Sequence, residues 1–184
     1  MGTGIREMTP GEQSRVIDYF LNADRQFLHG MGVDPAKLPG REEWHALISG
    51  DLDKPLMQRQ FYYLFWEKEG IPVGHSNINK IRFGREAFMH LHVWDGSLRQ
   101  KGLGHTLVRQ CITQYFTKFQ LKRLLCEPRA ENPGPNRTLE KLGFTLEKTY
   151  DTTPGWINYY QTVNRWVLER EGWKPLRDRP GPVS

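Results

Sequence analysis

The sequence predicts a single α/β domain, in which helices flank one twisted, mixed β-sheet. Residues 88–94 alternate aromatic and branched side chains as a strand does, and a glycine-containing segment then leads into a long stretch with helical periodicity. Residues 121–127 form a second apolar run. A strand, a helix and a strand in succession pair in parallel through a right-handed crossover, so these two strands are expected side by side. The length of 184 residues suits one domain with a sizeable core.

Composition narrows the class of protein. The chain is 38% hydrophobic and 12% aromatic, which excludes an intrinsically disordered protein. No run is apolar enough to span a bilayer and the N-terminus lacks a signal pattern, so we expect a cytoplasmic protein that does not bind a membrane. Cys111 and Cys126 lie in apolar sequence outside any ligand spacing, which predicts buried reduced thiols and no metal.

The charge pattern bears on the partners. The net charge is +5, but the basic residues are spread along the chain without a dense run. This argues against a protein dedicated to nucleic-acid binding and suits an enzyme that captures an anionic cofactor.

The N-terminal third should be largely helical. Thr9 and Glu12 have the spacing of a capping box, with Pro10 at the first helical position, so a helix is expected to begin there. Its buried face would carry Val16, Ile17, Phe20 and Leu21. Residues 22–40 are broken by Gly and Pro and are predicted to be irregular. A short helix that carries Trp44, Leu47 and Ile48 should follow and stop near Gly50.

The remaining elements alternate between strands and helices. Residues 61–68 and 71–79 read as two strands of a hairpin, and a turn at Gly84 leads into the strand at 88–94. A long helix is expected from Gly102 to about Phe119. Further along, a short helix between Asn132 and Gly143 and strands at 144–150 and 157–168 are expected. We therefore place the domain at residues 1–170 and a loosely ordered tail at 171–184. An exposed last hairpin could support a homodimer.

The junction between residues 88–94 and the long helix has the chemistry of an anion site. It reads Arg99-Gln100-Lys101-Gly102-Leu103-Gly104. The free N–H groups of a first helical turn and the helix dipole attract phosphate, and glycine lets the backbone approach an anion closely. A tight turn would explain the same glycines.

The Arg-x-x-Gly-x-Gly spacing resembles the pyrophosphate loop of the GCN5-related N-acetyltransferases (GNAT), which bind acetyl-CoA. A second motif strengthens the resemblance: Asn132, Pro135 and Leu139 precede Glu140-Lys141-Leu142-Gly143-Phe144 in the family's order and spacing. The resemblance covers about residues 62–167. Its pattern is closest to the ribosomal-protein and small-amine acetyltransferases.

The resemblance implies acetyl-CoA as the cofactor and assigns residues to it. The backbone of residues 92–94 would separate from the neighbouring parallel strand and hold the acetyl and pantetheine groups, and the glycine loop would hold the pyrophosphate. The implied binding residues are His92, Val93, Trp94, Arg99, Gln100, Lys101, Gly102, Leu103, Gly104, Asn132, Asn136 and Arg137. Alternatively, Asn132 caps a helix and Arg137 is a solvated surface charge.

Amide formation from a thioester needs a neutral amine, and hence a group that removes its proton. His90 and His92 should share one face of their strand, and histidine titrates near the working pH. His90 also matches a strand histidine of the siderophore-type lysine acyltransferases and of the serotonin acetyltransferases. Glu127 is the carboxylate alternative. The structural alternatives are hydrogen-bonded core histidines, and for Glu127 an ion pair with Arg129 or Arg123.

The expected function is transfer of an acetyl group from acetyl-CoA to a primary amine of a small molecule or a peptide N-terminus. A siderophore-type (hydroxy)lysine acyltransferase and a catalytically silent acetyl-CoA-binding module are the alternatives. Many members of the family use a tyrosine as the acid that protonates the leaving thiolate, and Leu139 occupies that position here. One of the tyrosines of the last hairpin could replace it.

Overall fold

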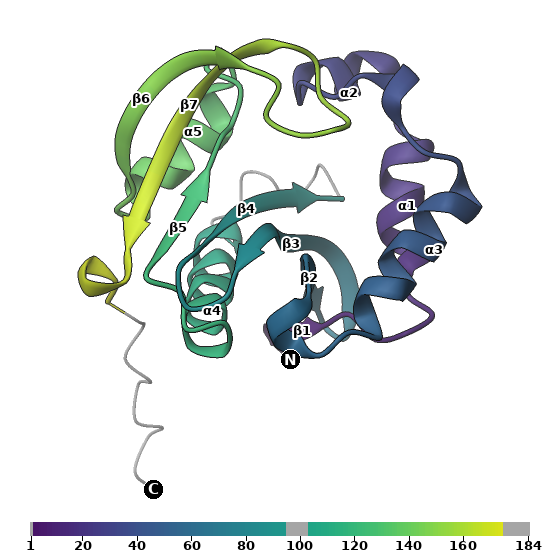
Figure 1. The fold of residues 1–184 in the computed structure, drawn as a ribbon, viewed down its shortest axis with the longest axis horizontal. Coiled ribbons are helices and arrows are strands. Elements are labelled where there is room, and N and C mark those ends of the chain that lie inside the picture. The colour runs from purple at the N-terminus through teal and green to yellow at the C-terminus, as the bar shows by residue number, and fades with distance from the viewer. Residues whose placement is uncertain (1, 95–102, 175–184) are drawn as a thin grey trace, which may run out of the picture.

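The structure, a computed structural model, describes residues 2–94 and 103–174 (Figure 1). Within these residues a seven-stranded mixed sheet has the order β1-β2-β3-β4-β5-β7-β6. Its strands are β1 (Thr3–Glu7), β2 (Phe61–Lys68), β3 (Ile71–Arg82), β4 (Glu86–Val93), β5 (Arg123–Cys126), β6 (Thr145–Thr152) and β7 (Gln161–Glu169). The pair β4–β5 is parallel and all other neighbours are antiparallel. The predicted fold class is confirmed.

Helices cover both faces of the sheet (Figure 1). On one face lie α4 (Leu103–Lys118) and α5 (Pro133–Lys141), and on the other lie α1 (Gln13–Leu21), α2 (Arg25–Gly30) and α3 (Arg41–Leu52). Short 3₁₀ turns occupy Pro35–Lys37, Leu56–Gln58 and Arg170–Gly172. None of the described helices is long and apolar enough to cross a membrane.

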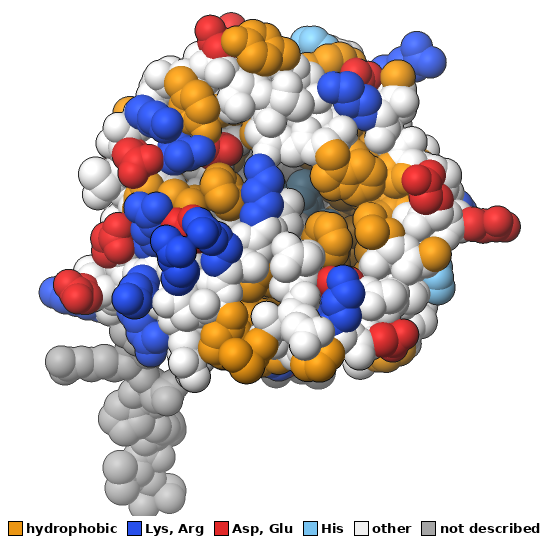
Figure 2. All heavy atoms as spheres, viewed as in Figure 1, with side chains coloured by type: hydrophobic (Ala, Val, Ile, Leu, Met, Phe, Trp, Pro, Cys, Tyr) orange, Lys and Arg blue, Asp and Glu red, His pale blue; other side chains and the backbone are white. Residues whose placement is uncertain are grey.

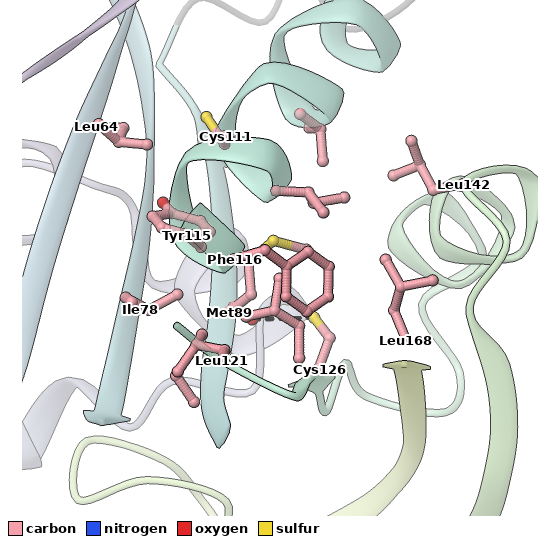
Figure 3. Close-up of a cluster of buried hydrophobic side chains, with 14 of the residues drawn as sticks. Leu64, Ile78, Met89, Cys111, Tyr115, Phe116, Leu121, Cys126, Leu142 and Leu168 are labelled. Atoms are coloured by element: carbon pink, nitrogen blue, oxygen red, sulfur yellow. Dashed lines mark hydrogen bonds between the residues drawn. The ribbon is translucent and has the colours of Figure 1, made fainter. Parts of the chain in front are cut away.

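The main core lies between α4 and the sheet (Figure 3). The stripe expected on the long helix is buried, with Phe116 next to Met89 and Tyr115 on the side of Leu64 and Ile78. Cys111 and Cys126 are both buried and free, as predicted. A second core packs α1 and α3 against β2. The large buried side chains of both cores fix the sheet between two helical layers.

The first helix begins later than predicted. Gly11 has a φ of +94°, a left-handed conformation that interrupts a helix, and α1 starts only at Gln13. The Glu12 carboxylate accepts hydrogen bonds from the backbone N–H of Thr9 at 3.0 Å and from its hydroxyl at 2.7 Å. Arg6 holds the same carboxylate through two further bonds. The capping-box residues therefore close a turn in front of α1.

Other boundaries also differ from the sequence prediction. Strand β1 was not expected, and it is held as an edge strand by pairing with β2. Within the segment predicted to be irregular, Asp24 accepts a hydrogen bond from the backbone N–H of Phe27 at 2.7 Å and caps α2. Helix α3 continues through Gly50 to Leu52. Strand β7 begins at Gln161, four residues later than predicted.

Only residues 171–174 of the predicted tail fall within the described structure. The indole of Trp173 donates a hydrogen bond to the Thr113 hydroxyl at 3.1 Å, and the Arg109 guanidinium lies 4.6 Å from the centre of the indole ring. These contacts tie the chain at Trp173 to α4. The division of the chain at residue 170 stays a prediction.

Candidate active site

Strands β4 and β5 pair only at their beginning. The parallel ladder joins residues 86–88 to residues 123–125, and β4 then continues past the end of this ladder to Val93. At the point of separation, the Cys126 thiol donates a hydrogen bond to the Met89 carbonyl at 3.0 Å. The separation expected at residues 92–94 thus begins earlier, just after Phe88. It leaves a gap in the middle of the sheet.

A cleft with a cavity volume of about 200 Å³ lies on the α1–α3 side of this gap. Figure 2 shows a hollow on this side of the molecule, with hydrophobic side chains on its right-hand side and a Lys or Arg side chain on its left. The floor of the cleft consists of polar side chains from β3 and β4, namely His75, Asn77, Asn79, His90 and His92. Its walls are mainly apolar and include Val16, Phe20, Met31, Trp44, Ile48 and Trp156. Glu127, Arg129 and Asn132 line the part of the cleft beyond the end of β5.

The three histidines of the floor lie on adjacent strands. His75 on β3 pairs with His92 on β4, and their rings stack with centroids 4.6 Å apart. The neighbouring residue pair joins Asn77 to His90. Ala87 and Met89, which alternate with the histidines on β4, are buried in the main core. The prediction that His90 and His92 share one face is therefore confirmed.

All three rings are neutral at pH 7. Burial lowers the pKa of His90 to about 4 and the pKa of His92 to about 3. Burial also lowers the pKa of His75, and the nearby His92 lowers it further. Within the described residues, His75 Nε2, His90 Nε2 and His92 Nδ1 are buried and have no hydrogen-bond partner. The floor therefore offers polar atoms that a bound molecule or water can satisfy.

Glu127 lies at the end of β5 in a closed cluster. Its carboxylate, 6% exposed, accepts hydrogen bonds from the Tyr150 hydroxyl at 2.5 Å and from Arg165 Nε at 2.6 Å. Arg165 also donates to the Tyr150 hydroxyl at 2.5 Å. The expected partners are elsewhere, because Arg129 pairs with Glu131 and Arg123 pairs with Glu86. The charge of Glu127 is thus neutralised by Arg165.

The predicted phosphate site falls partly outside the described residues. Arg99, Gln100, Lys101 and Gly102 belong to the undescribed segment 95–102. Helix α4 begins at Leu103, so Gly104 is in its first turn. A Cβ built on Gly104 would meet no other heavy atom within 4 Å. The described residues therefore leave the space beside this glycine empty.

The remaining predicted cofactor residues lie in and before α5. Asn132 is the residue before α5, but its side chain makes no capping hydrogen bond, and it lines the cleft. The side chain of Asn136 has a structural role. Its Nδ2 donates hydrogen bonds to the carbonyls of Arg129 and Asn132. Its Oδ1 accepts hydrogen bonds from Asn164 and Trp166. These bonds use all four positions of the amide. Arg137 is exposed on α5.

The family's acid position does not face the cleft in this chain. Leu139 is fully buried in the main core. Among the described residues, Tyr63 is the only tyrosine that lines the cleft, and burial raises the pKa of its hydroxyl. Tyr150, a candidate from the last hairpin, is held by Glu127 and Arg165 outside the cleft lining. The described structure therefore provides no readily ionised acid for the thiolate.

Three floor residues escaped the sequence prediction: His75, Asn77 and Asn79. Their signal is the alternation His-Ser-Asn-Ile-Asn in the second strand of the first hairpin. Polar side chains at every second position of a strand with a buried opposite face indicate a polar surface inside the protein. The pattern identifies β3 as a strand with a polar buried face. Which residues lie opposite this face depends on packing.

Comparison with known proteins identifies the family. The family model described as an acetyltransferase (GNAT) domain matches residues 4–145. This is most of the chain, which therefore belongs to the GNAT acetyltransferases. A search of curated protein sequences finds no match.

Solved structures of similar fold come from several acetyltransferases. RimL, a ribosomal-protein α-N-acetyltransferase solved with coenzyme A, is 18% identical with a TM-score of 0.72, covering 91% of this chain and 94% of its own. The spermidine N-acetyltransferase of Vibrio cholerae, solved with CoA and spermine, is 18% identical with a TM-score of 0.74, covering 92% and 96%. The aminoglycoside acetyltransferase AAC(6')-Ib, solved with coenzyme A, is 16% identical with a TM-score of 0.70, covering 93% and 96%. At this identity the likeness concerns the fold.

Proposed function

We propose that this chain is an N-acetyltransferase that transfers the acetyl group of acetyl-CoA to a primary amine. The observation that carries the proposal is the gap after Phe88, where β4 and β5 stop pairing. Helix α4 starts ten residues after the end of β4, and the polar cleft lies on the opposite side of the sheet. A cofactor held in the gap would have its phosphates near a helix N-terminus and its acetyl group near the cleft.

Residues of this chain fit such a cofactor. The part of the chain that lies beyond the β4–β5 ladder, including residues 92–94, would hold the acetyl group and the pantetheine arm. The first turn of α4, with Gly104 open in front, and the preceding residues Arg99 to Gly102 would bind the pyrophosphate. The side-chain amide of Asn132, which makes no capping bond, is available to the pantetheine arm. Asn136 would act by fixing the position of Asn132 through its carbonyl.

Acetyl-CoA would supply the thioester carbonyl that the amine attacks. We assign to His90 Nε2 the acceptance of the amine proton, because this atom is buried, unpartnered among the described residues and on the cleft floor. A histidine with a pKa of about 4 is neutral at pH 7 but is a weak base. The apolar walls offset this weakness, since burial also lowers the pKa of the bound amine and favours its neutral form.

Glu127 and His92 are the other two candidates for the base. Glu127 is less suited because the Tyr150 hydroxyl and the Arg165 guanidinium already occupy its carboxylate. The ring of His92 is enclosed by Tyr19, Phe20 and His75, which favours a role in holding the floor. With no acid at Leu139, catalysis would rely on positioning of the amine against the thioester.

Two measurements test the proposal. Calorimetric titration with acetyl-CoA tests cofactor binding, and thiol release in the presence of a panel of amines tests transfer. Binding with turnover supports the proposal. Binding without turnover on a wide panel would favour the catalytically silent module, and failure to bind acetyl-CoA would refute the assignment.

A further inference from the structure

The cleft has no unpaired charge on its described lining. Glu127 and Arg129 are the only charged residues of this lining, because its histidines are neutral. Glu127 is paired with Arg165 at 2.6 Å, and Arg129 is paired with Glu131 at 2.6 Å. An acceptor with several ammonium groups would therefore lack carboxylate partners on these walls.

The walls fit an apolar or aromatic body. Phe20 lies 5.2 Å from Trp44, and Trp44 lies 6.2 Å from Trp156, measured between ring centroids. Trp156 is 50% exposed, although large aromatic side chains are usually buried in a folded protein. In Figure 2, hydrophobic side chains border the hollow on its right-hand side. An aromatic ligand would cover this exposed indole surface and pack against Trp44.

The floor of the cleft adds one hydrogen-bond donor, which is set by the tautomer of His75. The Trp94 indole N–H is only a donor, and it donates to His75 Nδ1 at 2.8 Å. The neutral ring of His75 therefore carries its proton on Nε2. This N–H is buried on the cleft floor and has no partner among the described residues. A ligand oxygen or a water would satisfy it.

We propose that the acceptor is a small primary monoamine with an uncharged aromatic or apolar body, and that polyamines and aminoglycosides are poor acceptors. This inference rests on the proposed function and names its substrate class. A second ammonium group on the acceptor would be buried without a partner, which should lower kcat/KM at least about 100-fold. The similarity in fold to a spermidine acetyltransferase does not oppose this, because acceptor choice depends on the lining of the site and not on the fold.

The first test compares acceptors by thiol release at a fixed acetyl-CoA concentration. Phenethylamine and tryptamine represent the proposed class, and spermidine and kanamycin represent polycations. The proposal expects the highest kcat/KM for the aromatic monoamines. An equal or higher value for spermidine or kanamycin would overturn it, as would no turnover of any monoamine by protein that binds acetyl-CoA. Absence of acetyl-CoA binding would instead refute the proposed function.

The second test uses two pairs of variants. Leu47 and Met57 are both exposed apolar residues, 43% and 68%, but only Leu47 lines the cleft. Leu47→Asp should raise the kcat/KM ratio of spermidine to phenethylamine about tenfold, since the new carboxylate can pair with a second ammonium group, which phenethylamine lacks. Met57→Asp should leave the ratio unchanged. An unchanged ratio in Leu47→Asp as well would contradict the proposal.

The other pair concerns the aromatic wall, and it has a readout that does not require turnover. Trp156→Ala should weaken phenethylamine binding about tenfold. Quenching of tryptophan fluorescence in the presence of CoA measures this binding. Tyr160→Ala is the matched control, because Tyr160 is a 74% exposed aromatic outside the cleft lining. Equal effects of the two substitutions would contradict the role of Trp156.

Discussion

The indole N–H of Trp94 donates a 2.8 Å hydrogen bond to Nδ1 of His75. Trp94 follows β4 directly, and His75 lies on the adjacent β3, so this bond joins two strands below the cleft. It fixes the tautomer of His75, whose ring in turn stacks on His92. Trp94, His75 and His92 therefore form a preorganised unit at the floor of the cleft.

Replacing Trp94 by phenylalanine should show what this bond contributes. Trp94→Phe leaves His75 Nδ1 as a buried acceptor without its donor, which should lower the free energy of unfolding by about 1–3 kcal/mol. Urea denaturation measures the change. Trp173→Phe is the control, because Trp173 donates to Thr113 near the protein surface and its loss should cost less. Equal losses in the two variants would show that the His75 bond is not a structural constraint.

The buried histidines should make the protein sensitive to mild acid. The folded-state pKa values of His90 and His92, about 4 and about 3, lie below the ordinary value of 6.5. As the pH falls below 6.5, the unfolded chain gains protons that the folded chain does not accept, so stability decreases. Each such histidine contributes a slope of about 1.4 kcal/mol per pH unit until the folded pKa is reached.

Urea denaturation between pH 5.5 and 6.5 tests this slope and stays above the range, below about pH 5, in which carboxylates such as Glu12, with a pKa lowered to about 2 by Arg6, begin to contribute. His90→Gln should make the slope shallower. His45→Gln, at an exposed position on α3, should leave it unchanged. A wild-type slope in His90→Gln would mean that His90 is protonated in the folded protein.

The Glu127 cluster permits a separation of structural and catalytic roles. Glu127→Gln removes the charge of the acceptor in the 2.5 Å bond between the two side chains, and Tyr150→Phe removes the donor, so both should lower stability. If Glu127 only holds the cluster, turnover should fall by a similar factor in both variants. A much larger fall in Glu127→Gln at comparable stability would transfer the role of base from His90 to Glu127. Steady-state kinetics and urea denaturation of the same preparations decide between the two.

The elements that the sequence predicts well are those with strong local signals. The stripe of α4 and the alternation of β4 lie in segments where one face is wholly apolar, and the structure confirms both. Strand β1 lacks such a signal because it is short and depends on pairing with β2. The sequence predicts a helix start at residues 9–12. The positive φ angle of Gly11, which keeps this residue out of the helix, is seen only in the structure.

The candidate site was predictable only in part. The placement of His90 and His92 on one face follows from the period of a strand and could be read directly. The stack on His75 depends on the register between β3 and β4, and the partner of Glu127 depends on the register between β5 and β7. Neither register is encoded in a local motif. The burial of Leu139 in the core depends likewise on how α5 packs against the rest of the protein.

The proposed base has its own test. His90→Gln should reduce turnover about 100-fold or more, in the range of general-base catalysis. The acidic limb of the wild-type pH–rate profile should lie near pH 4 rather than near neutrality, since burial lowers the pKa of His90 to about 4. Steady-state kinetics from pH 4 to 8 measures both quantities, with His45→Gln as the control. Wild-type turnover in His90→Gln would leave Glu127 or a water as the base.

The most direct test of the account concerns the acetyl-CoA site at the start of α4. Gly104→Glu adds a carboxylate in the first helical turn, where a Cβ meets no other heavy atom within 4 Å, so the variant should fold as the wild type does. Thr117→Glu, exposed near the other end of the same helix, is the control for added charge. Calorimetric titration with acetyl-CoA should show at least about 100-fold weaker binding for Gly104→Glu and wild-type binding for Thr117→Glu. Wild-type affinity in Gly104→Glu would contradict a phosphate site at the start of α4.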